Sequence, residues 1–163
     1  MYVIGIDPGN TESAVTIYES VNDKIELSFK NANPNILLWI IGNLHRYMPF
    51  CMIAIEKVAS YGMAVGETVF ETVYWSGRFH QLIVEQQRGA VIHRITRNEV
   101  KNHLCHSSRA KDANIRQALI DRFGAPGTKK NPGKTYGISS DQWAALAVAV
   151  TCFDKYFTGD TKF

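Results

Sequence analysis

The sequence predicts an α/β protein, with a mixed five-stranded sheet flanked by helices, in a single domain over residues 1–163. The short runs Tyr2–Ile6 and Cys51–Ile55 are apolar without alternation, as in central strands that are covered on both faces. Other segments place apolar residues three and four positions apart, as in helices that cover a sheet. A length of 163 residues suits one such domain.

The composition narrows the class of protein. The chain is 45% hydrophobic and 20% charged, as in ordinary globular proteins, and its net charge of +3 permits an anionic partner. No apolar run could span a bilayer and the start lacks a signal-peptide pattern, so no membrane partner is expected. Cys51, Cys105 and Cys152 are odd in number and lack CxxC spacing, which favours a reducing, cytoplasmic location.

The first strand leads to a single carboxylate, Asp7. Pro8 cannot donate a ladder hydrogen bond, so the strand stops there, and Gly9 lets the chain turn away. An acid at the end of a buried strand costs free energy unless a positive group faces it. Asp7 is therefore either an aspartate that caps the turn or a metal ligand at the edge of the sheet.

Two more strands and a helix follow. Ser13–Glu19 and Ile25–Phe29 are rich in β-forming residues and are separated by turn residues, so with the first strand they predict an antiparallel meander. Residues Ile36–Tyr47 place apolar side chains at helical spacing, and Pro49 ends that helix.

The next strand, Cys51–Glu56, also ends on an acid. If it lies parallel to the first strand and beside it, Asp7 and Glu56 emerge at the same edge of the sheet, where open α/β sheets place ligand and metal sites. The alternative is a surface glutamate paired with a nearby lysine. A glycine-containing loop with Tyr61 and Met63 follows this strand.

The second half of the chain alternates helices with one more strand. A long helix is expected from Glu67 or Thr68 to Gln87, and the small residues Ser76 and Gly77 in its middle suggest close approach of another element. The remaining elements are a strand at 90–95, helices at 98–104 and 112–123, and a last helix with an apolar body at 144–153.

The last helix has a third acid at its head. We expect Ser139 or Ser140 to cap it and Asp141 to lie in its first turn, a position that the helix dipole alone favours. The preceding segment, Gly124–Gly137, combines glycines, prolines and three lysines without an apolar period, which predicts a mobile basic loop. That loop is either a solvated connector or a contact for an anionic partner.

Four segments carry a resemblance to a known family. They are GIDPGNTES at 5–13, IAIEKV at 53–58, VKNHL with SSRAKDANIRQAL at 100–119, and SSDQWAALAVAVTC at 139–152. In this order and at these separations, they resemble the motifs of the RuvC-type Holliday-junction resolvases over most of the chain. The resemblance implies an RNase H-like fold and a crossover junction endodeoxyribonuclease of DNA recombination and repair. The compact, divergent sequence would suit a phage-encoded member.

The resemblance also implies a catalytic metal site. Asp7, Glu56 and Asp141 match the family's acids and would hold Mg²⁺, two ions in each site, with Asp7 as the bridging ligand and Mn²⁺ as a possible substitute. Members of the family commonly carry two ligand-type residues one helical turn apart in the last motif. Aligned on the alanine-rich run, this chain has Asp141 in the first position and Ala144 in the second. A shift by two residues would instead put Asp141 in the second position, and either way the chain offers one carboxylate in that turn. The site is either a three-acid version or is completed by another group.

Neither of two further acids is expected to fill the gap, because Asp112 belongs to another helix and Asp154 lies over three helical turns further along.

Lys101 and Lys111 are expected near the scissile phosphate, Lys101 as a catalytic residue. Tyr61 and Met63 could wedge against bases at the centre of a junction, or could simply pack within their loop. Contacts to backbone phosphates, which give affinity but little sequence information, are expected from Arg109, Lys129, Lys130 and Lys134.

A four-way junction has two-fold symmetry, so paired nicks in opposing strands call for a homodimer, with the helix at 68–87 as the candidate interface.

The same fold could instead serve a nuclease that debranches flaps and forks. A third reading is an actin-like or sugar-kinase-like ATPase, because IDPGNT also resembles a phosphate-binding loop. The short chain and the lack of a second glycine-rich nucleotide motif disfavour it. The last alternative is a DNA-binding scaffold without catalysis.

Overall fold

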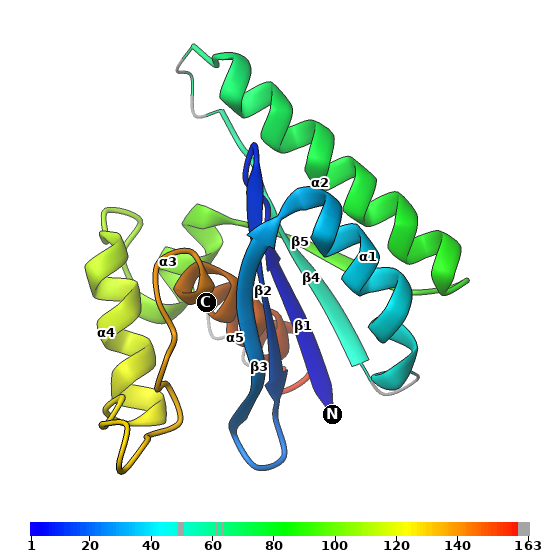
Figure 1. Ribbon diagram of the computed structural model, residues 1–163. Helices are drawn as coiled ribbons and strands as arrows, with labels where there is room; N and C mark the ends of the chain where they lie inside the picture. Colours follow the sequence, from blue (N-terminus) through cyan, green and yellow to red (C-terminus); the bar gives the residue numbers. More distant parts are fainter. Residues whose placement is uncertain (49–50, 61, 63, 160–163) are drawn as a thin grey trace.

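The computed structural model describes residues 1–48, 51–60, 62 and 64–159, and its centre is a five-stranded sheet (Figure 1). β1 to β3 form an antiparallel meander, whereas β4 lies parallel to β1, and β5 lies parallel to β4. The mixed five-stranded sheet predicted from the sequence is therefore confirmed. Across the sheet, the strands are β3 (Lys24–Ala32), β2 (Glu12–Glu19), β1 (Tyr2–Asp7), β4 (Cys51–Lys57) and β5 (Ile92–Thr96).

Helices flank both faces of the sheet (Figure 1). On one face lie α1 (Asn33–Asn43), the short 3₁₀ helix η1 (Leu44–Arg46) and α2 (Glu67–Gln86). On the other face lies α5 (Gln142–Tyr156), with α3 (Arg97–Cys105) and α4 (Asp112–Phe123) packed against it. None of the helices in the described part of the chain is long and apolar enough to cross a membrane.

Strand β1 separates two hydrophobic cores. Val3 belongs to the core under α5, whereas Ile4 and Ile6 belong to the core under α1 and α2, as the alternation of side chains in a strand requires. Gly5 faces α5, and a Cβ atom there would overlap the backbone oxygen of Ala145. The absence of a side chain at Gly5 therefore lets the alanine-rich helix pack closely over β1.

The ends of two elements differ from the sequence-based predictions. Helix α1 begins at Asn33 rather than Ile36, because Pro34 occupies the first turn, where a missing N–H is harmless. The predicted serine cap of the last helix is wrong. Asp141 is the N-cap residue of α5 and makes no side-chain capping bond, whereas the Ser139 N–H donates to Gln142 Oε1.

Two further expectations were only partly met. Ser76 is buried, but a Cβ atom at Gly77 would meet no described atom within 4 Å, so no element of the same chain approaches closely there. The loop 124–137 was predicted to be mobile, yet its backbone is internally bonded. The Gly133 N–H donates to the Pro126 carbonyl at 2.8 Å, and Thr135 is buried at 1% exposure.

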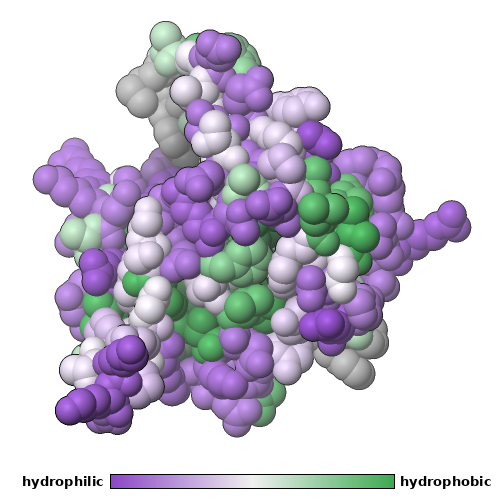
Figure 2. All heavy atoms as spheres, viewed as in Figure 1, coloured by the Kyte–Doolittle hydropathy of each residue, from purple (hydrophilic) through white to green (hydrophobic). Residues whose placement is uncertain are grey.

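The surface is hydrophilic over most of the face shown in Figure 2, and hydrophobic residues gather over α1 beside α2. Leu38 and Ile41 of α1 are 66% and 49% exposed. Helix α2 adds Phe70, Val73 and Tyr74, which are also exposed. Val73 and Tyr74 follow Phe70 by three and four positions, so the three side chains lie on the same side of α2. These five residues are called the α1–α2 apolar surface below.

Candidate active site

Asp7 and Glu56 emerge side by side at the carboxyl edge of two parallel strands. The register pairs Ile6 of β1 with Ile55 of β4, so the two acids follow at the same level. Ile6 and Ile55 point into the core under α1 and α2. Side-chain alternation therefore turns both carboxylates toward α5, on the opposite face of the sheet.

A buried hydrogen-bond network holds the loop after Asp7. The Gly9 N–H donates to Ser13 Oγ at 3.1 Å, and the Ser13 hydroxyl donates to Asn33 Oδ1 at 2.6 Å. Asn33 Nδ2 in turn donates to the Gly9 carbonyl at 3.0 Å. Because Ser13 and Asn33 are almost fully buried, these bonds tie the loop to β2 and α1 and so fix the direction of Asp7.

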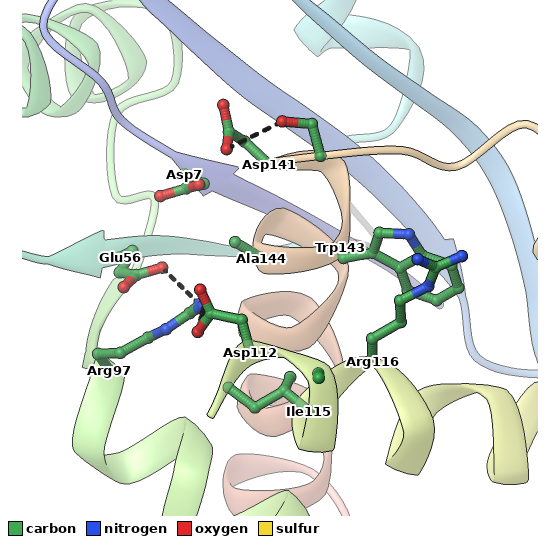
Figure 3. Close-up of a pocket in the computed structure, with 11 residues that line it drawn as sticks. Asp7, Glu56, Arg97, Asp112, Ile115, Arg116, Asp141, Trp143 and Ala144 are labelled. Carbon is green, nitrogen blue, oxygen red and sulfur yellow. Dashed lines mark hydrogen bonds and ion pairs between the residues drawn. The ribbon is translucent and has the colours of Figure 1, made fainter. Parts of the chain in front are cut away.

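The three predicted acids share one cavity of about 660 Å³ (Figure 3). Asp141 reaches it from the head of α5, and Ala144 lines it one helical turn later. Asp141 is therefore the one residue of the last motif that brings a carboxylate to the cavity. The cavity is also lined by Arg97 of α3, Asp112 and Arg116 of α4, and Trp143 of α5.

The carboxyl groups of Asp7 and Glu56 resist ionisation. Burial, together with the neighbouring charges of Glu56 and Asp141, raises the pKa of Asp7 to about 8. Burial also raises the pKa of Glu56, although the positive charge of Arg97 opposes the shift. Two adjacent acids whose pKa values are raised by burial, at the edge of a cavity, mark a candidate functional site.

Arg97 is the residue of this site that sequence reasoning missed. It is the first residue of α3 and directly follows β5, which lies parallel to β4, so it arrives beside Glu56. Its Nη1 lies 3.5 Å from Glu56 Oε2, and its Nη2 lies 2.6 Å from Asp112 Oδ1. Its place directly after a third parallel strand was the only sequence signal that could have identified it.

Asp141 is held by a second cation that the sequence did not reveal. Its Oδ2 lies 2.8 Å from Nζ of Lys30 on β3. The same ammonium group lies 3.2 Å from Glu12 Oε2, at the start of β2. Since β3 lies at the edge of the sheet and α5 packs across the meander, this contact depends on the tertiary fold alone.

Asp112 was not expected to fill the gap beside Asp141, yet it lies close to the three acids. Asp112 is the first residue of α4, and it lines the same cavity as Ala144, where its charge contributes to the raised pKa of Glu56. Figure 3 shows its side chain directed toward Arg97. Asp154 lies elsewhere, paired with His103 at 2.8 Å and with Arg122 at 2.7 Å.

The predicted DNA-contacting residues spread over a wider area. Lys101 is half-buried, and its charge tends to lower the pKa of Glu56 although it does not line the cavity. Lys111 is exposed at the head of α4, next to Asp112. Arg109 lines a separate cavity of about 440 Å³ between α3 and α4.

The lysines of the loop 124–137 lie away from the carboxylates, at the opposite end of α4 from Asp112 (Figure 1). Lys129 and Lys130 are exposed. Nζ of Lys134 lies 3.7 Å from Asp23, in the turn between β2 and β3. The predicted wedge residues, Tyr61 and Met63, lie outside the described residues.

The chemistry of the cavity fits a hard divalent cation. Its donors are carboxylate oxygens, and Glu56 Oε2 is buried without a hydrogen-bond partner among the described residues. As the side chains stand, no group of three or more His, Cys, Asp or Glu in the described ranges is placed to bind a metal. Arg97 and Lys30 instead hold Glu56 and Asp141, so a metal would have to displace at least one of these contacts.

Comparisons with known proteins identify the fold that carries this cavity. No protein-family model matches the chain, and no curated protein matches its sequence. The solved structure of Thermus thermophilus RuvC is 19% identical over 95% of each chain, with a TM-score of 0.71. The structure of T. thermophilus RuvC in complex with a Holliday-junction substrate is 20% identical, covers 93% of this chain and 92% of that chain, and has the same TM-score. The chain therefore has the RNase H-like α/β fold of RuvC.

Proposed function

We propose that this protein is a divalent-metal-dependent, structure-selective DNA endonuclease that resolves Holliday junctions by paired nicks in opposing strands. The observation that carries the proposal is the convergence of Asp7, Glu56 and Asp141 in one cavity, at the carboxyl edge of a RuvC fold. The RuvC of T. thermophilus with the same fold has a Holliday junction as its substrate. The four motifs of the sequence agree with that substrate.

The carboxylates would hold Mg²⁺, for which Mn²⁺ could substitute. When bound, such ions activate water and stabilise the leaving 3′ oxygen, and the family resemblance implies a pair of them. Asp7 lies between the other two acids and would bridge the pair, with Glu56 and Asp141 on either side. Lys101 would neutralise the scissile phosphate from the Glu56 side of the site.

The remaining basic residues would bind the arms of the junction. Lys111 adjoins the cavity and would contact the strand that is cut, with Arg109 further along the same side. Because the loop lysines lie at the far end of α4, they would contact an arm rather than the scissile phosphate. Tyr61 and Met63 follow β4, which ends at the carboxylates, and a role for them against unstacked bases stays part of the proposal.

A homodimer would supply the two active sites that paired nicks require. The α1–α2 apolar surface supports α2 as the interface, because exposed apolar residues at helical spacing commonly mark a contact surface. The open space around Gly77 would let a second helix approach. We also propose that the protein acts in the cytoplasm of a bacterial or phage-infected cell.

Cleavage assays test the proposal directly. A labelled immobile four-way junction, a linear duplex, a flap and a fork would be incubated with Mg²⁺ and either wild-type protein or Asp7→Asn. Symmetric paired nicks across the junction, absent in the variant, are expected. Equal cutting of all branched substrates would indicate a broader debranching nuclease, and junction binding without cleavage in Mg²⁺ or Mn²⁺ would contradict the catalytic role.

A further inference from the structure

Arg97 places a positive charge inside the cluster of carboxylates. Its side chain is only 25% exposed and lies between Glu56 and Asp112, as Figure 3 shows. Its charge also acts on Asp7, where it opposes the rise in pKa. Arg97 therefore occupies the side of the site on which one ion of a bound pair would contact Glu56.

We infer that Arg97 takes the place of one of the two ions that the resemblance implies. The site would then bind a single divalent ion, on the side of Asp7 and Asp141, with Arg97 as the fixed positive charge on the Glu56 side. This inference rests on the proposed nuclease function and deepens it, because it assigns a role in cleavage to a residue that the motifs do not include.

The contacts of Arg97 indicate a permanent occupant of that position. A guanidinium group stays protonated at all relevant pH values, and two carboxylates hold this one. A divalent ion beside Glu56 would meet its repulsion at short range. Nη1 of Arg97 is buried 3.5 Å from Glu56 Oε2 and makes no hydrogen bond among the residues described, so the guanidinium group keeps donor capacity that a small shift of the side chain would turn toward a phosphate oxygen.

The balance of charge in the cavity favours the same conclusion. Four carboxylates line the cavity, from Asp7, Glu56, Asp112 and Asp141, and the guanidinium groups of Arg97 and Arg116 offset two of them. If metal binding ionises all four carboxyl groups and releases Lys30 from Asp141, one divalent ion balances the remaining charge before DNA is bound, whereas a second would leave an excess. Ala144, which also lines the cavity, adds no carboxylate for a second ion.

The ion pair of Asp141 with Lys30 is the contact that a metal would displace. Lys30 holds Asp141, but it also contacts Glu12 at 3.2 Å and keeps that partner if Asp141 turns away. The side chain of Asp141 is 47% exposed, whereas that of Glu56 is only 16% exposed. An ion can therefore displace Lys30 from Asp141 more easily than Arg97 from Glu56.

Arg97 would act in cleavage as a donor of hydrogen bonds. Hydrolysis forms a bond between a water oxygen and phosphorus, and that water releases one proton to solvent. It breaks the bond from phosphorus to the 3′ oxygen, which takes up one proton from solvent. Arg97 would stabilise the negative charge that develops on the phosphate and the leaving oxygen while keeping its own proton. Its role is then electrostatic, as a metal ion's would be on that side.

The number of bound ions tests this inference without relying on activity. Mn²⁺ would be titrated into wild-type protein, Arg97→Ala and the charge-preserving control Arg97→Lys, with electron paramagnetic resonance and calorimetry as readouts. Wild type and Arg97→Lys are expected to bind one ion per protomer, with the spectrum of an isolated ion. Arg97→Ala is expected to bind two, with the spin coupling of ions about 4 Å apart.

Two more variants locate the single ion. Glu56→Gln should still bind one Mn²⁺, whereas Asp141→Asn should bind none, and circular dichroism would check that each variant is folded. Two coupled ions in wild type, or one ion in Arg97→Ala, would overturn the inference. The junction assay is scored separately: a two-ion protein that resolves junctions contradicts only this inference, and a one-ion protein that never cuts contradicts the proposed function.

Discussion

At the scale of single residues, the buried carboxyl of Asp7 has a direct consequence for stability. Its pKa rises from 3.8 to about 8 in the folded protein. Between these pH values the unfolded chain has lost a proton that the folded protein keeps. The contribution of protonated Asp7 to the free energy of unfolding is thus fully present below about pH 4, and it is lost as the pH rises through the folded-state pKa of about 8.

We expect Asp7→Asn to stabilise the metal-free protein at pH 8, because the amide removes this cost. The free energy of unfolding should rise by at least about 1 kcal/mol at pH 8, and the difference should shrink toward zero near pH 4. Urea unfolding in the presence of a chelator measures it. Asp121→Asn, exposed on α4, is the matched control and should change little. A destabilised Asp7→Asn protein at pH 8 would contradict the prediction.

Lys30 competes with a metal for Asp141, so its removal should strengthen metal binding. We expect Lys30→Ala to bind Mn²⁺ several-fold more tightly, where tenfold corresponds to about 1.4 kcal/mol. Isothermal titration calorimetry gives the affinity. Lys24→Ala is the control, since Lys24 lies at the other end of β3 and pairs with Glu26 at 2.8 Å. Equal affinity in wild type and Lys30→Ala would show that Lys30 does not compete.

At the scale of elements, the packing of α5 on β1 decides whether the site assembles at all. Gly5→Ala should lower the free energy of unfolding by at least about 2 kcal/mol, because the new methyl group would overlap the backbone of α5 at Ala145. Gly77→Ala in α2 meets open space and should raise it by about 0.5–1 kcal/mol. Denaturant unfolding of both variants measures the contrast, and a well-tolerated Gly5→Ala would argue against the close packing.

At the scale of the whole molecule, the α1–α2 apolar surface predicts an assembly. Phe70→Asp should convert a dimer into monomers, because it places a charge on a residue that is 63% exposed on α2. Sedimentation velocity reports the change, and paired junction nicks should become single nicks. Val91→Asp, also an exposed apolar residue but outside this surface, is the control. A monomeric wild type would contradict the proposed interface.

The distribution of basic residues predicts two separable effects on DNA. Replacement of Lys129, Lys130 and Lys134 by glutamine should weaken junction binding and lower the salt slope by about one for each phosphate that is no longer neutralised. The nicking rate at saturating protein should stay unchanged. Lys101→Gln, beside the carboxylates, should instead reduce that rate with little effect on affinity. Equal effects of both changes on rate would mean that the loop reaches the scissile phosphate.

Local sequence patterns were sufficient for the elements that carry the acids. The apolar runs of β1 and β4 are visible without any tertiary information, and the parallel pairing they imply brings Asp7 and Glu56 together. Helix boundaries were less predictable, because Pro34 and the head of α5 depend on turn geometry. The prediction of a capping serine was wrong for that reason. Ser140 has a positive φ of 47°, and Asp141 is the N-cap residue of α5.

The sequence by itself determined the strands and the order of the helices, because the period of apolar residues and the turn residues are properties of neighbours in the chain. It also showed an acid at the end of two strands and at the head of the last helix, which the family resemblance joined into one set. Only the tertiary structure decided what surrounds those acids. Arg97, Asp112 and Lys30 reach the cavity from α3, α4 and β3, and no local pattern distinguishes them from other charged residues. Their positions follow from strand order and helix packing, which join residues that lie far apart in the chain.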